Sequence, residues 1–349
     1  MKALVTGGAG FIGSHLVDAL LAARWEVVAL DNLSTGRRAN IAHLAGEPRF
    51  VFVEGDICHK GLVARLVRGC DLVFHLAARV GVKHVVSDPL QGMRTNVMGT
   101  EAVLSAVYRE GVRVCLASSS EVYGASLAVP YAEEGPRLLG PTWIPRWSYA
   151  TAKALDEHLC FAYRDRGLQM SIVRYFNAYG PRLHPDGYGS VVARFIQQAL
   201  AGQPLTIHGD GQQTRAFTYV EDTVRATILA GTQEAALGEV FNVGTPVETT
   251  IEDLARQIIA LTGSPSALSY LPYRSAYGAD FADPRRRCPD TGKARRLLGF
   301  EAQVPLERGL MQTVAWFREG IDKPGADNAD KPGFSQKPGL SAPRLSADR

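Results

Sequence analysis

The sequence lacks the features that mark several large classes of protein. No apolar run among its 349 residues reaches the roughly 18 that a transmembrane helix needs, and the first residues lack the apolar stretch of a signal peptide. The five cysteines are an odd number without a Cys-x-x-Cys pair, which argues against a disulfide framework and a metal site. Basic side chains number 38 against 35 acidic ones, too small an excess to predict nucleic-acid binding. We therefore expect a cytoplasmic protein with no metal, membrane span or nucleic-acid partner.

The first two-thirds of the chain alternate short apolar runs with helical patterns. The runs that we expect to be strands are Lys2–Thr6, Glu26–Leu30, Phe50–Val53, Asp71–His75, Val112–Ala117 and Met170–Tyr175. The patterns that we expect to be helices are Ile12–Ala23, Gly61–Val67, Pro89–Arg109 and Ser148–Arg166. Runs that are apolar throughout suit strands buried on both faces, and alternation of strand and helix is typical of parallel sheets. The predicted fold class is therefore α/β, a doubly wound parallel sheet followed by a smaller α/β lobe.

We divide the chain into three parts. Residues 1–177 form the expected cofactor-binding domain, and residues 178–320 form a substrate-binding lobe from which segments near 215–244 return to the first domain. The lobe's expected helices are near Ser190–Ala201, Val220–Ala230, Ile251–Leu261 and Thr291–Leu298. Residues 321–349 repeat Lys-Pro-Gly three times and carry few apolar side chains, so burial cannot offset their ordering entropy and we expect a disordered tail.

A glycine-rich turn separates the first predicted strand from the first predicted helix. It contains Gly-x-Gly-x-x-Gly at Gly8, Gly10 and Gly13, and also Gly-x-x-Gly-x-x-Gly beginning at Gly7. Glycines permit a tight turn and let the backbone approach a pyrophosphate, which the following helix N-terminus attracts. Because the motif stands in the required strand–turn–helix order, we assign Gly7, Gly10, Phe11, Ile12 and Gly13 to a dinucleotide site.

An acidic residue ends the second predicted strand. Asp31 lies 18 residues after Gly13, where a carboxylate accepts both ribose hydroxyls of NAD and repels a 2′-phosphate. Arg37 and Arg38 follow closely and offer the alternative of binding that phosphate, but the acid favours NAD. The remaining candidates for the cofactor site are Asn32, Asp56, Ile57, Ala77 and Lys153.

Three further residues form a candidate catalytic set. Tyr149 and Lys153 are four residues apart on a predicted helix and therefore share one face. The lysine ammonium favours a phenolate, which can take a proton from a substrate hydroxyl while hydride leaves the same carbon. Ser119 lies within three serines just past the fifth predicted strand, at the sheet edge where such folds bind ligands.

The motifs together resemble those of a known family, the extended short-chain dehydrogenase/reductases that modify nucleotide sugars. The segments that carry the resemblance are Thr6–Gly13, His75–Ala78, Ser118–Gly124, Tyr149–Lys153 and Arg174–Asn177. The resemblance spans roughly residues 1–318 and implies a Rossmann domain with about seven strands. It also implies a tightly held NAD that is reduced and reoxidised within one turnover, a UDP-sugar substrate, and a homodimer packed through helices near Asn96–Arg109 and Ala150–Arg166.

The resemblance also assigns roles residue by residue. It makes Tyr149 the base, Ser119 the hydroxyl that assists it, Lys153 the residue that orients the ribose and tunes Tyr149, and Glu121 a further catalytic residue. The residues that it assigns to the substrate are Asn177 for a phosphate, Arg215 and Arg287 for the diphosphate, and Leu205 on the strand that packs against the base.

The family's reactions all begin with oxidation at sugar C4 and then diverge. Dehydratases carry an Asp-Glu pair after the catalytic Thr, whereas this chain has Ser120 and Glu121, which argues against dehydration. The chain resembles UDP-glucuronate decarboxylases in three segments, namely Ser-Ser-Glu, Gly180–His184 and the segment around Arg287. The segments Arg79–Lys83 and Pro145–Tyr149 instead resemble bacterial UDP-glucose 4-epimerases. We favour an NAD-dependent UDP-hexose 4-epimerase, with UDP-glucuronate decarboxylase as the alternative.

Two readings from other classes also remain. A redox-sensing regulator would need the glycine turn but not Ser119, Tyr149 and Lys153, so the presence of all three favours an enzyme. A net dehydrogenase would release reduced cofactor, and retained NAD in the purified protein would distinguish a closed redox cycle from it.

Overall fold

A computed structural model describes residues 1–80, 88–184, 190–273 and 284–321. Its centre is a sheet whose strands are β1 (Lys2–Thr6), β2 (Glu26–Asp31), β3 (Phe50–Glu54), β4 (Leu72–His75), β5 (Arg113–Ser119), β6 (Met170–Tyr175) and β11 (Val240–Val243). In the described residues these strands pair in parallel in the order β11-β6-β5-β4-β1-β2-β3. The predicted doubly wound sheet is therefore confirmed, and its seventh strand comes from the second half of the chain.

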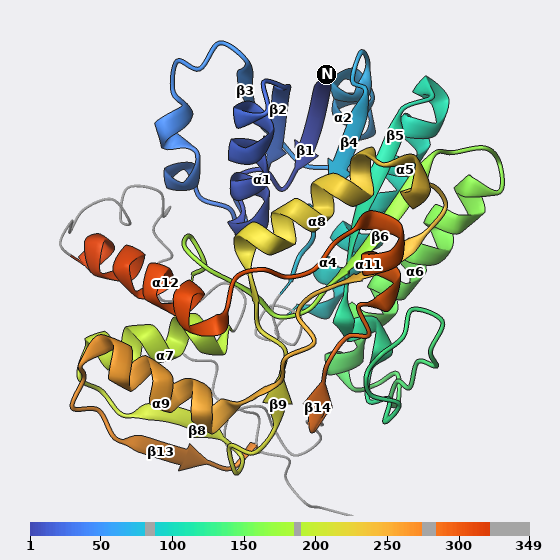
Figure 1. The fold of residues 1–349 in the computed structure, drawn as a ribbon. Helices are drawn as coiled ribbons and strands as arrows, with labels where there is room; N and C mark the ends of the chain where they lie inside the picture. Colours follow the sequence, from blue (N-terminus) through green and yellow to red (C-terminus); the bar gives the residue numbers. More distant parts are fainter. Residues whose placement is uncertain (81–87, 185–189, 274–283, 322–349) are drawn as a thin grey trace, which may run out of the picture.

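Helices cover both faces of this sheet (Figure 1). On one face lie α1 (Phe11–Ala22) and α8 (Val220–Thr232). On the other face lie α2 (Lys60–Val67), α5 (Gly99–Glu110) and α6 (Ser148–Arg164). Successive residues of β1 alternate between the two hydrophobic clusters that result, with Ala3 and Val5 in one and Leu4 in the other. Both faces of the strand are buried, which is why its sequence is apolar throughout.

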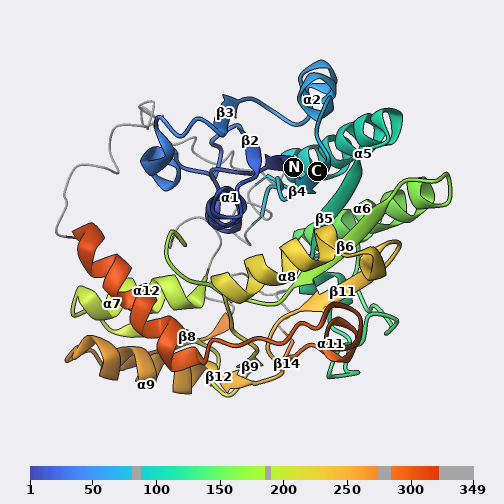
Figure 2. The ribbon, with the colours of Figure 1, turned by 45° about the horizontal axis from the view of Figure 1, so that its top comes forward.

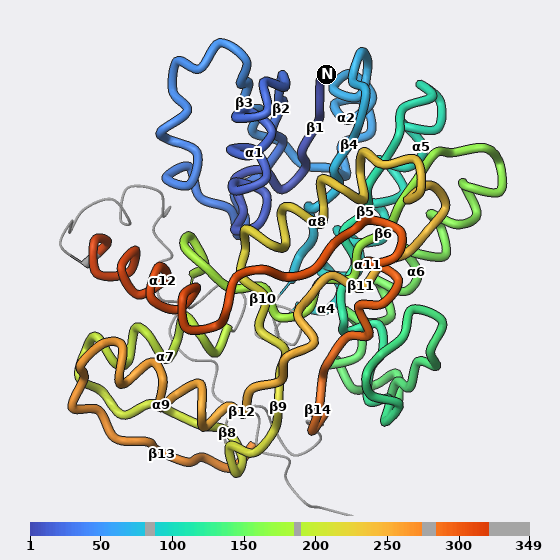
Figure 3. Tube along the Cα trace, viewed as in Figure 1, coloured from blue at the N-terminus to red at the C-terminus, as the bar shows by residue number. Residues whose placement is uncertain are grey.

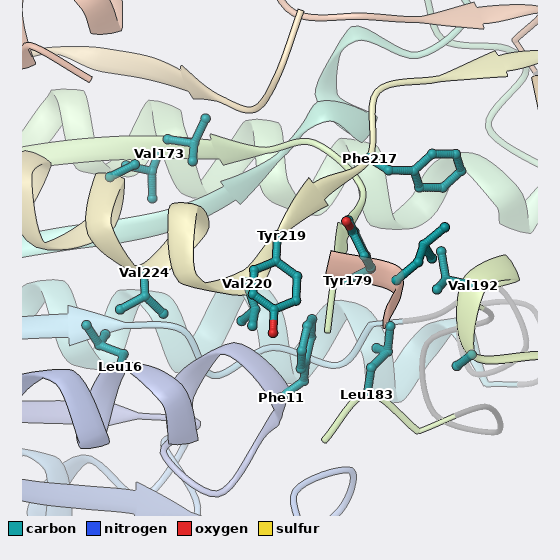
Figure 4. Packing of buried hydrophobic residues seen from close by; sticks show 14 of the residues in the cluster. Phe11, Leu16, Val173, Tyr179, Leu183, Val192, Phe217, Tyr219, Val220 and Val224 are labelled. Carbon is teal, nitrogen blue, oxygen red and sulfur yellow. The ribbon is translucent and has the colours of Figure 1, made fainter. Parts of the chain in front are cut away.

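The first cluster continues from the sheet into the lobe and joins the two parts. Phe11 on α1 packs near Tyr219 and Val220 at the start of α8, while Leu183 and Val192 lie on the lobe side (Figure 4). All five side chains are at least nine-tenths buried. This continuous packing fixes the lobe against the ends of the strands.

The lobe lies at the carboxyl ends of the large sheet's strands (Figures 1 and 2). Its helices are α7 (Val191–Leu200), α9 (Ile251–Thr262) and α12 (Leu306–Ile321), whereas α11 (Gly292–Leu298), which we expected in the lobe, packs on β11 at the edge of the large sheet. Its short strands are β7 (Ala178–Tyr179), β8 (Leu205–His208), β9 (Thr214–Arg215), β10 (Thr218–Tyr219), β12 (Thr249–Thr250), β13 (Leu268–Leu271) and β14 (Arg286–Arg287). They form the small sheets β10-β7, β12-β9-β14 and β13-β8. The strands of the last two sheets lie in the lower part of the tube in Figure 3.

The structure departs from the sequence expectations in two further places. Helix α12 was not predicted, and the expected helix Pro89–Arg109 is divided into α4 (Pro89–Met93), a π-helical turn (Arg94–Met98) and α5. The π turn buries Asn96, whose amide is hydrogen-bonded to the backbone of Arg79. Single π turns inside α-helices are frequent at functional sites. Most of the tail that we expect to be disordered lies outside the described residues.

In the described helices, no segment is both long and apolar enough to cross a membrane.

Candidate active site

A cavity of about 500 Å³ lies where the strands of the large sheet end and the lobe begins. Its wall on the sheet side comes from the turns that follow β1, β2, β4, β5 and β6, and its wall on the lobe side comes from α7, β8, β9 and β14. Doubly wound sheets bind ligands at this edge because the loops there leave the sheet in opposite directions. With two exceptions, Asp56 and Leu205, the residues expected to bind or react lie on the cavity wall.

The glycine turn forms one end of the cavity. A Cβ atom at Gly13 would stand 2.0 Å from the Gly7 carbonyl oxygen, and one at Gly7, whose φ is +73°, would stand 2.9 Å from the Ala77 nitrogen. Helix α1 then begins after Gly10 with no side-chain cap and no acidic residue in its first turn. The backbone therefore stays open to a pyrophosphate at the positive end of the helix dipole, so these residues fit NAD.

Asp31 stands beside the turn at the end of β2. Its carboxylate accepts hydrogen bonds from the Ala9 and Leu33 backbone N–H groups at 3.0 and 2.8 Å. Burial raises the pKa of Asp31, and these N–H groups counteract part of the rise. A Cβ atom at Gly36 would lie 2.7 Å from this carboxylate, so the glycine keeps space beside it. Arg38 pairs instead with Glu54, away from the cavity, which suits NAD over its 2′-phosphorylated form.

The segment after β3 forms another part of the same wall. Gly55 and Ile57 line the cavity, whereas the intervening Asp56 is not among the lining residues. Its carboxylate accepts hydrogen bonds from the Asn32 side chain at 3.0 Å and the Cys58 backbone at 2.8 Å. Asp56 therefore holds the loop together, and Asn32 and Ile57 are the side chains here that face the cavity.

The three candidate catalytic residues line the middle of the cavity. Ser119 is the last residue of β5, and its hydroxyl accepts a hydrogen bond from the Glu121 backbone at 3.2 Å. Tyr149 and Lys153 lie on the first turns of α6. The Lys153 ammonium donates to the Ala117 carbonyl at 2.9 Å and pairs with Asp156 at 3.3 Å, so its charge is fixed beneath the cavity wall.

A charged cluster that we call the Glu121 triad lies next to Ser119. Arg287 and Arg146 donate to the two Glu121 carboxylate oxygens at 2.5 and 3.0 Å. Burial opposes ionisation of Glu121, but the charges and hydrogen bonds of Arg287 and Arg146 outweigh it and lower its pKa to about 2. All three residues line the cavity and both arginines are over nine-tenths buried, so the wall there carries one net positive charge.

The expected substrate residues divide between the cavity and the core. Asn177 and Arg215 line the cavity, and each is hydrogen-bonded to the backbone of the β9 region. Arg287, which we expect on a diphosphate, also lines the cavity and is paired there with Glu121. We expected the Leu205 side chain to bind substrate, but it does not face the cavity. It is fully buried in the hydrophobic core. The cavity residue of its strand β8 is His208, at the opposite end.

Sequence reasoning assigned no role to Arg146. It lies three residues before Tyr149, in a 3-10 turn that begins at Pro145 and leads directly into α6. That spacing of three residues was the available signal, since helical positions three apart lie on the same side. Among the described residues, no three His, Cys, Asp or Glu side chains are grouped to hold a metal ion.

The fold and the cavity together define a Rossmann-type, NAD-binding protein of the short-chain dehydrogenase/reductase kind. The chain belongs to the NAD dependent epimerase/dehydratase family, whose family model matches residues 3–244. NAD is therefore its cofactor, and the resemblance drawn from the motifs is confirmed.

Relatives show how varied this family is. UDP-N-acetyl-alpha-D-glucosaminuronate decarboxylase of Bacillus cytotoxicus is 41% identical over 318 residues, which cover 91% of this chain and 98% of that protein. UDP-glucuronic acid decarboxylase 1 of Xenopus tropicalis is 39% identical over 92% of this chain and 73% of that protein. The UDP-glucuronic acid 4-epimerase of Bacillus cereus, solved with UDP-glucuronic acid and NAD, has a TM-score of 0.82 at 33% identity, covering 91% and 99% of the two chains. This chain is similar to enzymes of both reaction types.

Proposed function

We propose that this protein is a decarboxylase that removes the C5 carboxylate of a UDP-hexuronate through a 4-keto intermediate. The observation that carries the proposal is the Glu121 triad, in which one ionised carboxylate is held between two buried arginines on the cavity wall. Beyond the diphosphate that every UDP-sugar carries, a hexuronate adds one negative charge that matches the positive charge of the triad, whereas a neutral hexose adds none. The curated relatives named above support the same reaction.

The first half of the reaction depends on Ser119, Tyr149 and Lys153. Tyr149 takes the proton of the C4 hydroxyl, Ser119 donates a hydrogen bond to the same oxygen, and the Lys153 charge stabilises the phenolate before that transfer. NAD, when bound, accepts hydride from C4 and returns it at the end of the cycle. These steps leave a ketone at C4, Tyr149 protonated, and the carboxylate β to the ketone.

The second half breaks the bond between C5 and the carboxylate carbon. Its electron pair moves to the C4 oxygen, CO₂ leaves, and the Tyr149 phenol donates its proton to that oxygen. C5 then takes a proton from solvent, which replaces the lost carboxyl group, and the enol proton returns to Tyr149. When hydride returns to C4, Tyr149 gives this proton to the C4 oxygen and is again a phenolate. Arg287 and Arg146 hold the carboxylate end of the sugar beside Glu121 until it leaves.

A 4-epimerase is the second candidate, and it was the reaction that the sequence favoured. Its support is the similarity to solved 4-epimerases, including the UDP-glucose 4-epimerase of Thermotoga maritima with a TM-score of 0.82 at 34% identity, covering 92% of this chain and 100% of that one. An epimerase would use the same Ser119, Tyr149 and Lys153 but would return hydride to the opposite face of C4. For a hexuronate it would also have to keep the carboxylate in place.

The two reactions differ in their products, so incubation with separate substrates distinguishes them. The purified protein is mixed, without added NAD, with UDP-glucose, UDP-glucuronate or UDP-N-acetylglucosaminuronate, and the products are identified by NMR. A UDP-pentose or its N-acetylamino analogue, formed from a uronate and absent with UDP-glucose, is the expected result. A galacto-configured product that keeps all its carbons would support the epimerase and contradict the decarboxylase.

We also propose that the protein is a homodimer, as the family resemblance implies. Support comes from exposed apolar side chains on adjoining helices, namely Leu90, Met93 and Met98 before α5, Tyr108 on α5 and Leu155 on α6. Helices α5 and α6 pack beside each other, as Figure 2 shows.

A further inference from the structure

A buried carboxylate that the proposed reaction does not use lies on the catalytic helix. Asp156 is fully buried, and one of its oxygens is 3.3 Å from the Lys153 ammonium. The structure leaves both oxygens without a well-formed hydrogen bond from the described residues. Burying an acid with so few partners costs free energy of folding. We therefore look for a functional reason for its position beside Lys153.

The positions of Tyr149, Lys153 and Asp156 along α6 place the Asp156 carboxylate on the same side of the helix as the proposed base. Tyr149, Lys153 and Asp156 stand at positions i, i+4 and i+7 of α6 and therefore share one face of the helix. Lys153 lies between the other two and is itself only 3% exposed. With little water around it, the charge on Asp156 acts strongly on Lys153 and, through it, on Tyr149.

The charged groups that face Asp156 come from several elements. On α6 they are Lys153 and Glu157, and Glu157 is already neutralised by the Arg174 guanidinium of β6 at 2.7 Å. His75 of β4 is buried close to Lys153, and burial together with that cation lowers its pKa to about 3, so it is neutral. Cys160 and Cys115 have pKa values raised by burial, and they remain thiols. Lys153 is therefore the cation that Asp156 faces.

Asp156 is ionised at neutral pH in spite of its burial. Burial raises its pKa to about 6, while Lys153 and Thr100 act in the opposite direction. Above this value the Asp156 charge offsets part of the Lys153 charge that would otherwise stabilise the Tyr149 phenolate. A base that must both take and return a proton in each cycle works best with a pKa near the working pH.

We propose that Asp156 is a positioning residue that acts through Lys153. Its buried carboxylate holds the ammonium in place and moderates its charge, so that Tyr149 can both accept and give up a proton at neutral pH. The inference rests on the proposed role of Tyr149 as the base and is independent of which sugar reaction follows.

The test is a direct titration of Tyr149 in the NAD-loaded protein. Ultraviolet absorbance of ionised tyrosine is followed against pH, and the curve of Tyr149→Phe is subtracted from that of the wild type. The same subtraction is made for Asp156→Asn with and without Tyr149→Phe. Residues seven apart on a helix are separated by about 10 Å, where a unit charge at an effective dielectric of about 20 shifts a pKa by about one unit. We therefore expect the Tyr149 pKa to fall by about one unit in Asp156→Asn.

The control is Asp165→Asn, which removes a carboxylate that is 67% exposed at the far end of α6 and should leave the Tyr149 curve unchanged. Asp156→Ala gives the same readout if the asparagine variant does not fold. A Tyr149 pKa that is unchanged or raised in folded Asp156 variants would overturn the inference. If the wild-type Tyr149 itself titrates at the ordinary tyrosine value, the proposed base fails instead, and the two failures are thereby separated.

Discussion

At the scale of single residues, charge is concentrated where the substrate would react. Arg146 and Arg287 are buried on either side of the partly buried Glu121, and Lys153, which also lines the cavity, is buried beside Asp156. Buried charges tend to be retained for a role in chemistry or specificity, because replacing them by apolar groups is often neutral or stabilising. The triad and the Lys153–Asp156 pair therefore each predict a distinct dependence of stability on pH.

Glu121→Gln should destabilise the protein at neutral pH and less so in acid. The pKa of Glu121 is lowered from 4.5 to about 2, so its charge contributes stability that is fully present above 4.5 and lost as the pH falls toward 2. Two and a half pKa units correspond to about 3 kcal/mol, and roughly half of this remains at pH 3. Urea unfolding of both proteins from pH 7 to pH 3 measures the difference, and a difference that does not change with pH contradicts the assignment.

Asp156→Asn should change stability in the opposite direction to Glu121→Gln. The pKa of Asp156 is raised from 3.8 to about 6, so the folded state holds a proton that the unfolded state has lost between these values. Stability therefore falls as the pH rises through this range, and the asparagine variant should unfold at a higher temperature than wild type at pH 8. The gain, at most about 3 kcal/mol, should disappear near pH 4. A variant that melts lower than wild type at pH 8 would show that the ion pair with Lys153 stabilises the fold.

At the scale of elements, the site depends on how strands end and helices begin. The glycine turn between β1 and α1 is closed so tightly that a single methyl group would collide with backbone. Helix α6 carries Tyr149, Lys153 and Asp156 on one face, so small changes in its first turns move all three. The π-helical turn before α5 places Asn96 against the backbone of Arg79 at the cavity.

Gly13→Ala should abolish retention of NAD. The added Cβ would stand 2.0 Å from the Gly7 carbonyl, so the turn must open and the first turn of α1 must move away from the pyrophosphate. Cofactor released from the purified protein by denaturation is measured by its absorbance. Gly320→Ala near the end of α12 is the matched control, since its Cβ would meet no atom within 4 Å and NAD content should be normal. A Gly13→Ala protein that keeps a full complement of NAD would contradict this account of the turn.

The sequence was most informative where one element follows the next in a regular way. The apolar runs at Lys2–Thr6 and Met170–Tyr175 became strands with those bounds, because strands buried on both faces must be apolar throughout. Helix α12 was not found from the sequence, because its amphipathic pattern stands after a region of short, irregular elements. The π turn was also missed, because its sequence continues an ordinary helical pattern and its distortion arises from tertiary contacts.

Within the site, the sequence identified residues by type but not by partner. Ser119, Tyr149 and Lys153 were predicted, and they line one cavity. Arg287 was predicted to bind a diphosphate, which stays a prediction, whereas its pairing with Glu121, 166 residues away in the chain, was not foreseen. Such a contact depends on how the lobe packs against the sheet, which local patterns do not encode. Leu205 shows the same limit, because a strand that borders a cavity still points alternate side chains into the core.

At the scale of the whole molecule, two parts of the chain share one reaction cavity. The sheet supplies the cofactor turn, the proposed catalytic residues and Asn177, and the lobe supplies Arg215 and Arg287. The hydrophobic cluster that runs from α1 and α8 into the lobe fixes these two sets relative to each other (Figure 4). Under the proposed function, we expect the lobe to select a substrate whose reacting carbon lies over the sheet edge.

The proposed homodimer predicts a separable effect on assembly. Met98 is 57% exposed and Leu155 is 43% exposed on adjoining helices, so replacing both by Glu would put charge into an apolar interface. Sedimentation should give about twice the chain mass of 37.8 kDa for the wild type and the single-chain mass for the double variant. Met311→Glu, which replaces a 56% exposed methionine on α12, is the matched control and should sediment like the wild type. A wild type that sediments as a single chain would refute the dimer.

The most direct test of the central claim follows the carboxylate carbon itself. UDP-glucuronate labelled at C6 with ¹³C is mixed with an equal amount of purified protein without added NAD, and the label is located by NMR after one turnover. Decarboxylation at the Glu121 triad predicts that the label appears as CO₂ and bicarbonate while the sugar product is an unlabelled UDP-pentose. Label that stays in a UDP-hexuronate inverted at C4 would contradict the account and establish epimerisation in its place.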